Sequence, residues 1–452
     1  MVSSSLIKTV RFMDLRRWSA NHTLHTRIKS KYPLVPLSQV LKRIKKPISI
    51  EDKTVYKRIT IRLYGQGVLK RDELYGSEIG TKKQFIAQAG QLIISRIDAR
   101  NGAFGIVPQD LNGAIVTNDF WLFDVQNALP QYLTLVLSSD RFQQYWETQS
   151  SGTTNRQRVS EEDFLRAKIA LPPIEAQREL LEKYNSTIKK ANNLEQQAGN
   201  LEKDLEQWVY DFLGIKVREN NNSKLLLNTV RFQNIQQWGY DKIALHFPYS
   251  FEKYKAYSFA SHPSWLKEIH RGKSPEYCKQ KGSIILNQKC NRKNEIDLRY
   301  AKNVSETWLA KIPSNLLTKK NDIIVNSTGE GTLGRASLIA SDEHVGLAYD
   351  SHVLLLRLNL TEVDPLLFVY LFNSTFGQKQ VELYKSAQAT KQTELGIENT
   401  KKIRMPLPPL SVQKNISNVI REKTFQMSKL RNETNKLHQL SKKEFEEAIF
   451  GE

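Results

Sequence analysis

The sequence predicts an α+β protein in which two duplicated mixed α/β domains are separated by two long helices that form an antiparallel coiled coil. The main observation is a motif of the form Leu-Pro-Pro-x-x-x-Gln that occurs twice, at 171–177 and 407–413. Each copy opens a long stretch with helical periodicity and follows a basic stretch rich in predicted strands, which indicates a duplicated unit. The predicted segments are a first domain at 1–170, a first long helix at 171–215, a second domain at 216–405 and a second long helix at 406–452.

Shorter matches in the same chain order support the duplication. One such pair could arise by chance, but four pairs in order are hard to explain without a repeat. The matched segments are 9–12 with 229–232, 91–95 with 322–326, Asp119 with Asp350, and 151–157 with 386–392.

Charge separates the predicted domains from the predicted helices. The chain of 452 residues carries a net charge of +20. Residues 1–170 hold 26 Lys and Arg against 15 Asp and Glu, and residues 216–405 hold 28 against 18, whereas the helical segments carry net charges of −3 and +2. Two basic domains on a nearly neutral frame indicate one polyanion contacted at two places. The alternative, a generally basic soluble protein, would spread the charge evenly.

The strands of the first domain are predicted by alternation and by turn residues. Residues 55–64 alternate, which predicts a half-buried strand whose exposed face is aromatic and basic. The apolar face holds Val55, Ile59, Ile61 and Leu63, and the other face holds Tyr56, Arg58, Arg62 and Tyr64.

The remaining elements occur in the same order in both domains. An Asn-Gly turn between apolar runs favours a hairpin in the first domain. The first domain should contain strands at 92–95, 104–107 and 120–125 and a helix at 132–146. The second should contain strands at 323–325, 336–339 and 353–358 and a helix at 366–383.

A proline pair begins each long helix, where proline costs little. Two apolar series spaced by seven residues follow in the first helix, as in a coiled coil, and the second helix carries a weaker seam. We expect the helices to pair antiparallel, as a rod of roughly 54 Å for about 36 residues. The alternative is that each helix packs against its own domain. The first series is Tyr184, Ala191, Ala198, Leu205 and Phe212, and the second is Leu180, Leu194, Leu201 and Trp208.

Motifs for catalysis are missing from the sequence. The segment from Gly329 to Gly334 has the spacing of a dinucleotide-binding loop, but strand-like residues follow it, so we interpret it as a hairpin turn. Cys278 and Cys290 lack the spacing of a zinc site or a disulfide framework, which indicates free thiols in a reducing compartment. Because no signal peptide or bilayer-spanning apolar run is found, we expect a cytoplasmic protein without catalytic residues, bound metal or membrane contact.

Taken together, these residues resemble the specificity (S) subunit of type I restriction–modification systems. The resemblance covers essentially the whole chain and depends most on the two Leu-Pro-Pro motifs. The segments 94–103 and 322–329 also resemble parts of such subunits, whereas Ser386-Ala387-Gln388-Ala389 lacks the glycine found at 151–154.

The resemblance implies a function in defence against foreign DNA. Each domain would be a target-recognition domain that reads one half of a bipartite double-stranded DNA sequence, and the helices would set the unread spacer. The helices would also dock two adenine-methylating modification subunits, and restriction subunits would join them. S-adenosylmethionine, ATP and magnesium would bind to those partners, and this chain would bind no cofactor.

Candidate DNA-contacting residues are the basic and amide side chains in loops beside the repeated strands, together with Tyr56, Arg58, Arg62 and Tyr64. Arg, Asn and Gln can read base edges, whereas Lys and Arg contacts to phosphate give position without sequence information. For any single residue, a solvated surface position is an equally good interpretation. The loop candidates are Arg96, Arg100, Asn101, Asn118, Asn155, Arg156 and Arg158 in the first domain, and Lys289, Arg292, Asn326, Arg335, Gln388, Lys391 and Gln392 in the second.

Two other functions remain open at this point. The chain could be the specificity subunit of a fused methyltransferase–nuclease, which the neighbouring genes would reveal. It could also be a coiled-coil scaffold whose basic domains bind RNA or protein. Recovery of the native complex without a methyltransferase would favour the scaffold.

The change Arg156→Ala tests base reading. If Arg156 contacts a base edge, its loss should relax one position of the target by about 1–3 kcal/mol. Binding measured on a set of duplexes with single base changes would show this, and equal weakening on every sequence would contradict it.

Overall fold

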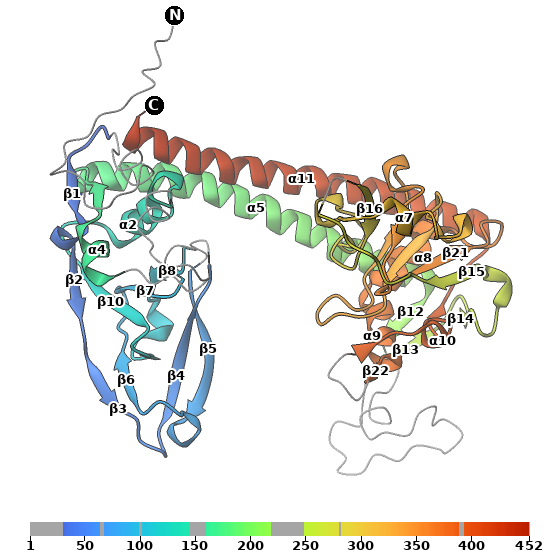
Figure 1. Ribbon diagram of the computed structural model, residues 1–452, viewed down its shortest axis with the longest axis horizontal. Coiled ribbons are helices and arrows are strands. Elements are labelled where there is room, and N and C mark those ends of the chain that lie inside the picture. Colours follow the sequence, from blue (N-terminus) through green and yellow to red (C-terminus); the bar gives the residue numbers. More distant parts are fainter. Residues whose placement is uncertain are drawn as a thin grey trace, which may run out of the picture. The chain divides into compact units, whose positions relative to one another are not determined.

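The computed structural model describes residues 30–63, 67–98, 102–143, 160–217, 248–279, 282–387 and 393–451 (Figure 1). The chain divides into two compact units, and each unit contains part of both long helices. Unit 1 comprises Met1–Glu195 and Arg431–Glu452, and unit 2 comprises Gln196–Leu430. The predicted repeats at 9–12, 229–232 and 151–157 lie outside the described residues, as does most of 386–392.

Unit 1 contains two main sheets. The four-stranded sheet is antiparallel, with the order β2 (Leu41–Ile44), β10 (Phe120–Val125), β7 (Leu92–Ser95) and β8 (Phe104–Ile106). The five-stranded sheet has the order β3 (Pro47–Ser49), β6 (Lys83–Ile86), β9 (Ile115–Val116), β4 (Val55–Ile61) and β5 (Val68–Tyr75). A short pair joins β1 (Leu34–Pro36) to β11 (Lys168–Ala170), and two short helices are α2 (Pro130–Leu137) and α4 (Glu161–Arg166).

Alternation along β7 and β10 gives the four-stranded sheet two buried faces. Ile93 and Leu122 belong to a cluster with residues of the five-stranded sheet. Ile94, Trp121 and Phe123 belong to a second cluster that includes side chains of α2, α4 and the long helices. Because successive strand residues point to opposite faces, the four-stranded sheet packs against the five-stranded sheet on one face and against the helices on the other.

Unit 2 repeats the four-stranded sheet. Its order is β15 (Leu266–Arg271), β21 (Val353–Leu358), β18 (Ile323–Asn326) and β19 (Ala336–Leu338), again antiparallel throughout. A three-stranded sheet contains β17 (Lys302–Val304), β16 (Ser283–Leu286) and β20 (Ala348–Tyr349). Two-stranded pairs are β12 (Ile215–Val217) with β13 (Tyr249–Phe251), β14 (Tyr257–Ser258) with β24 (Arg404–Met405), and β22 (Ser386–Ala387) with β23 (Thr393–Glu394). The short helices are α7 (Glu306–Leu309), α8 (Pro365–Asn373), α9 (Thr375–Tyr384) and α10 (Ile397–Thr400).

The duplication predicted from the sequence is therefore confirmed at the level of strand order. A polar pair also occupies the same place in both sheets. One member directly precedes β7 or β18, and the other lies opposite it on β10 or β21. In unit 1 Gln91 donates from Nε2 to Asp124 Oδ1 at 2.9 Å. In unit 2 Arg357 donates from Nε and Nη2 to the carboxylate of Asp322 at 2.9 and 2.8 Å. The pair has the same position in both units, but it consists of an amide and a carboxylate in unit 1 and of a guanidinium and a carboxylate in unit 2.

The two long helices pair antiparallel, as predicted. Helix α5 is Ile174–Leu213 and helix α11 is Leu410–Phe450. In unit 1 Lys183 pairs with Glu444 at 3.2 Å and Glu195 with Arg431 at 3.5 Å, so the numbers rise along one helix as they fall along the other.

The buried seam of α5 follows its alanine series more closely than its leucine series. Ala191 and Ala198 are completely buried, and Thr434 Oγ1 of α11 donates to Ala191 O at 3.3 Å. Small side chains allow two backbones to approach closely. Trp208 of the other series is 38% exposed, so the seam does not bury it fully. In unit 2 Leu205 and Ile416 also lie in one cluster with the sheet, so the helices pair and pack against the domain as well.

The repeated motif places a buried glutamine at the start of each long helix. Gln177 Oε1 accepts a hydrogen bond from Leu129 N at 2.8 Å, and its Nε2 donates to Pro172 O at 2.8 Å. Gln413 makes the same two bonds, with Asp364 N at 2.8 Å and with Pro408 O at 2.7 Å. Both glutamines are at most 1% exposed. Each therefore joins its long helix to the residue that precedes α2 or α8, which explains why the motif occurs in both units.

The described residues contain no helix with the length and hydropathy that crossing a bilayer requires.

Replacing either glutamine tests this explanation. Gln177→Ala and Gln413→Ala each leave a buried backbone N–H without its acceptor, so the free energy of unfolding should fall by about 1–3 kcal/mol. Urea unfolding measures the loss. Gln197→Ala is the control, because Gln197 lies exposed on the same helix and should change stability by less than about 0.5 kcal/mol. Equal stability of Gln177→Ala and Gln197→Ala would contradict the explanation.

Candidate nucleic-acid interface

A groove of about 670 Å³ runs along β4 and β5 of unit 1 and reaches the ends of β7 and β10. Four basic side chains and one acidic side chain line it, together with several hydroxyl and amide groups. The basic residues are Arg58, Arg62, Lys70 and Arg71, the acidic residue is Asp98, and the polar residues include Thr60, Thr81, Gln84, Ser95 and Thr117. A concave surface with this balance attracts a polyanion and offers donors and acceptors to base edges.

Arg58 is held in the groove wall by Asp72. Its Nε and Nη2 donate to the two carboxylate oxygens of Asp72, both at 2.7 Å. This bidentate bond raises the pKa of Arg58 and lowers the pKa of Asp72. Because the fork of the guanidinium is occupied, Arg58 presents its remaining Nη1 edge, whereas the exposed Arg62 has no side-chain bond to another described residue.

Tyr56 was predicted to lie on the exposed face of β4, and this prediction is wrong. The side chain is only 9% exposed, its hydroxyl accepts from Glu51 N at 3.1 Å, and it packs with Ile50 and Ile79. Val55, predicted to be buried, is 49% exposed. The cause is a second cluster on the same face of the sheet as Tyr56. Ile115 of β9 belongs to that cluster, whereas the next residue, Val116, belongs with Ile59 to the cluster on the opposite face.

Arg96 lies on the other side of the sheet from the groove. Its guanidinium sits 5.7 Å from the ring of Trp121, and its Nη1 donates to Asn118 O at 3.4 Å. Asn118 itself is exposed. Ser95, the preceding residue, lines the groove. The structure therefore does not bring Arg96 together with Arg58 and Arg62.

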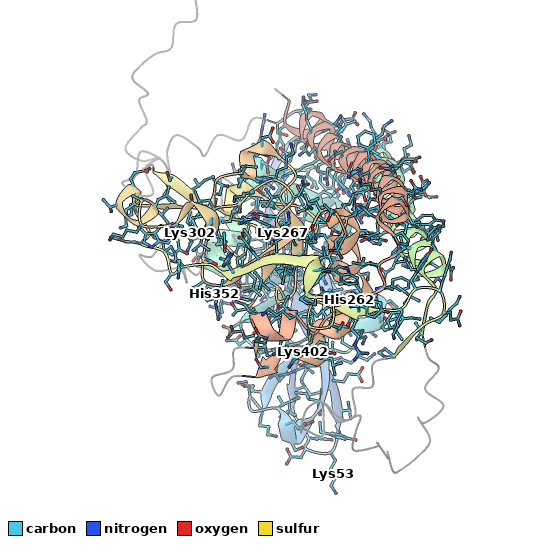
Figure 2. The ribbon with its side chains drawn as sticks, turned by 90° about the vertical axis from the view of Figure 1, so that its right-hand side faces the viewer. Lys53, His262, Lys267, Lys302, His352 and Lys402 are labelled. Carbon is cyan, nitrogen blue, oxygen red and sulfur yellow. The ribbon has the colours of Figure 1, made fainter. Side chains whose placement is uncertain are left out.

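Unit 2 presents an exposed surface in which cations cover tyrosine rings. The guanidinium of Arg292 lies 3.8 Å from the ring centroid of Tyr300, and Lys302 Nζ lies 4.4 Å from that of Tyr277. Both tyrosines are more than 40% exposed, and the Lys302 side chain extends from β17 (Figure 2). Lys289 is exposed in the same segment. Cation–π contact holds such side chains in place on an open surface.

Asn326 is completely buried, so the prediction that it lies in a surface loop is wrong. Its Nδ2 donates to Gln288 O at 3.0 Å. The residue ends β18 inside the sheet, where its polar side chain ties β18 to the loop after β16. Arg335 is half-buried and donates from Nη2 to Gly331 O at 2.8 Å.

The segment from Gly329 to Gly334 joins two antiparallel strands, β18 and β19, so the predicted hairpin turn is confirmed. Gly329, Gly331 and Gly334 all have positive φ angles, of 108°, 72° and 73°. Only glycine adopts such angles readily. The glycines serve the turn, and a strand follows them where a nucleotide-binding loop would have a helix.

Several predicted residues lie outside the described part of the chain, and their contact with DNA stays a prediction. These are Tyr64, Arg100, Asn101, Asn155, Arg156, Arg158, Gln388, Lys391 and Gln392.

Sequence reasoning missed Lys70, Arg71 and Gln84 in the groove of unit 1, and Tyr277, Tyr300 and Lys302 in unit 2. The strand that carries Lys70 and Arg71 does not alternate, so its pattern gave no signal. The tyrosines are scattered along the chain, and only the fold brings each beside a cation. Within the described ranges, no group of three or more His, Cys, Asp or Glu side chains could hold a metal ion.

A family model matches most of the chain. Residues 31–203 and 267–442 match a family model described as the type I restriction modification DNA specificity domain.

A curated relative, the MjaX specificity subunit of a type I restriction enzyme from Methanocaldococcus jannaschii, is 32% identical over 95 residues. That alignment covers 19% of this chain and 22% of the relative, so the chain spans about a fifth of the curated relative's length.

Similar solved structures include a chain from a study of type I R-M system assembly and conformational transition, with 14% identity, a TM-score of 0.49 and coverage of 92% of this chain and 97% of that chain. The HsdS subunit from Thermoanaerobacter tengcongensis has 14% identity, a TM-score of 0.37 and coverage of 93% and 96%. The S subunit from M. genitalium has 10% identity, a TM-score of 0.43 and coverage of 94% and 98%.

The basic groove predicts how the affinity for DNA should depend on salt concentration. Arg62→Ala should weaken binding to every duplex by a similar factor, because phosphate contacts carry no sequence information. The slope of log K against log salt concentration should become shallower by about 0.9. Titration at several salt concentrations measures this, with Lys189→Ala on the exposed side of α5 as the control. A change in sequence preference with an unchanged slope would contradict a phosphate contact.

Proposed function

The chain belongs to the family of type I restriction modification DNA specificity domains, and we propose that it is the DNA-recognition subunit of a type I restriction–modification enzyme. Each unit reads one half of a bipartite double-stranded target. The paired helices α5 and α11 set the length of the unread spacer between the two halves.

The observation that carries this proposal is the double match of one family model. The first match, 31–203, covers the sheets of unit 1 and most of α5, and the second, 267–442, covers the main sheets of unit 2 and most of α11. Each match thus contains one candidate nucleic-acid surface and one long helix. A chain that carries the same recognition module twice is suited to a target with two separate half-sites.

The two candidate surfaces supply the two kinds of contact that recognition needs. Exposed cations such as Arg62 and Lys289 supply phosphate contacts, which give affinity and orientation. Side chains in the wall of the unit 1 groove, Thr60 and Thr117 among them, offer the donors and acceptors that distinguish base pairs in the major groove. The two surfaces differ in residue type, which suits the reading of two different half-sites.

The partners follow from the same assignment. Two modification subunits dock on the helices and bring S-adenosylmethionine for adenine methylation. Restriction subunits bring ATP and magnesium. The MjaX relative is named a type I restriction enzyme specificity subunit, which supports this proposal for the matched segment. The fused methyltransferase–nuclease and the RNA-binding scaffold are not favoured, because the matching family model is that of type I systems.

Methylation in the host tests the recognition function. Single-molecule sequencing of adenine methylation should show a bipartite methylated sequence in cells that carry this gene and its loss in cells without it. An unchanged methylation pattern in both cell types would contradict the proposal.

Lengthening both helices tests the spacer function. Seven residues added after Gln197 of α5 and after Ser428 of α11 keep the seven-residue repeat in phase and add about 10 Å, or about three base pairs of rise. Methylated sites should then show unchanged half-sites and a longer spacer. Substitution of seven residues at the same places, without insertion, is the control. A spacer of the original length in the insertion variant would exclude the helices from this role.

A further inference from the structure

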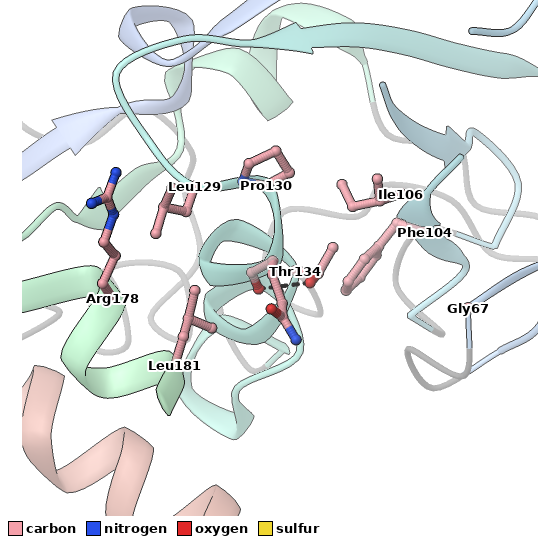
Figure 3. Close-up of a pocket in the computed structure, with 10 residues that line it drawn as sticks. Gly67, Phe104, Ile106, Leu129, Pro130, Thr134, Arg178 and Leu181 are labelled. Atoms are coloured by element: carbon pink, nitrogen blue, oxygen red, sulfur yellow. Dashed lines mark hydrogen bonds between the residues drawn. The ribbon is translucent and has the colours of Figure 1, made fainter. Parts of the chain in front are cut away.

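Unit 1 contains a second pocket, of about 710 Å³, which shares no lining residue with the basic groove (Figure 3). Phe104 and Ile106 of β8 form one wall, and Leu129 with Pro130 at the start of α2 forms another. Leu181 of α5 closes the third side. Three secondary structure elements of unit 1 thus converge on one apolar space.

Arg178 is the one charged side chain among the residues that line this pocket. It lies exposed on the first turns of α5, and it makes no hydrogen bond or ion pair with another described residue. Two polar residues, Gln131 and Thr134, and two glycines, Gly67 and Gly105, complete the lining. Gln131 is tied to α5 by a hydrogen bond from its Nε2 to Asn185 Oδ1 at 3.0 Å. The pocket therefore combines apolar walls with one positive charge at its edge.

In unit 2, a side chain of the chain itself occupies the place that corresponds to this pocket. In unit 2 Asp364 precedes α8, and its carboxylate accepts from the backbone N–H groups of Leu366 and Leu367 at 3.1 and 3.0 Å. Ser417 of α11 donates from Oγ to the same carboxylate at 2.5 Å. The start of α8 is thus closed by an internal carboxylate.

In unit 1 that carboxylate is missing. Leu129 stands in the place of Asp364, since each donates its backbone N–H to the motif glutamine. Leu181 stands in the place of Ser417, four residues after that glutamine. Helix α2 accordingly begins without a side-chain cap. Both leucines line the pocket, so unit 1 is open and apolar where unit 2 is closed and polar.

We propose that this pocket docks a short acidic segment of the modification subunit, with an apolar side chain against the leucine walls and a carboxylate beside Arg178. The proposal rests on the proposed function, because that function supplies the partner. The carboxylate would lie where Asp364 lies in unit 2, next to the start of α2, where a negative charge is favourable.

The apolar walls of the pocket favour a protein segment over DNA as the occupant. A phosphate would satisfy Arg178 but would leave the partly exposed residues Ile106, Leu129 and Pro130 facing water. An apolar side chain buried in the pocket removes that surface from water and gains affinity in proportion to its area. Interfaces between proteins combine a buried apolar anchor with an arginine in this way.

A cross-linking experiment on the full complex tests the proposal. The chain carries the photoreactive residue p-benzoylphenylalanine in place of the exposed Gln131, and it is co-expressed with the methyltransferase encoded beside it and bound to duplex DNA. Illumination should link residue 131 to a segment of the methyltransferase that contains Asp or Glu next to an apolar residue. Arg178→Glu should reduce the cross-linking yield about tenfold, because it places a second negative charge beside the carboxylate of the docked segment. Lys189→Glu, the same charge change elsewhere on α5, should leave the yield unchanged.

Charge exchange completes the test. Changing the acidic residue of the linked segment to Lys should restore cross-linking to the Arg178→Glu chain. Cross-links to DNA or within this chain would overturn the proposal, as would an assembled, methylating complex that gives no cross-link. If no complex with the methyltransferase forms at all, the proposed function itself fails, and the two failures are thereby distinguished.

Discussion

The pairing of α5 with α11 is the constraint on which the rest of the structure depends. A helix with one apolar stripe must bury that stripe against another element. Each of these helices has 40 residues or more and contributes to both compact units. One half of each helix joins the core of unit 1, and the other half joins the core of unit 2. Neither unit is complete without both helices, although the helices lie 196 residues apart in the sequence, from Leu213 to Leu410 with both ends excluded.

The duplication keeps the frame and varies the chemistry placed on it. Strand order, the proline pair and the buried glutamine recur in both units. The polar pair beside the central strand is an amide and a carboxylate in one unit and a carboxylate and an arginine in the other. The residue before the short helix is Leu129, which provides no side-chain cap, in one unit and Asp364, which does, in the other. Such variation on a shared frame suits the proposed recognition of two unlike half-sites.

Much of the fold could be predicted from the sequence because the repeat fixes the order of elements. The strands at 92–95 and 323–325, the hairpin after Gly329 and the antiparallel helices all follow from patterns that are local or repeated. The candidate site was harder to predict. Alternation shows which side chains share a face of a strand but not that both faces are covered, as Ile50 and Ile79 cover the face of Tyr56. Burial of Asn326 depends on the loop after β16, which is distant in the sequence. The role of Gln177 could be read only when its partner at Leu129 was in place.

The central claim is that two separate surfaces of one chain contact two separate stretches of DNA. A hydroxyl-radical footprint of the assembled methyltransferase complex, on a duplex carrying the sequence methylated in the host, measures this most directly. The account predicts two protected stretches divided by an unprotected spacer of constant length, with protection of one stretch lost selectively when cations of one unit are removed. A single continuous stretch, weakened as a whole by changes in either unit, would contradict it.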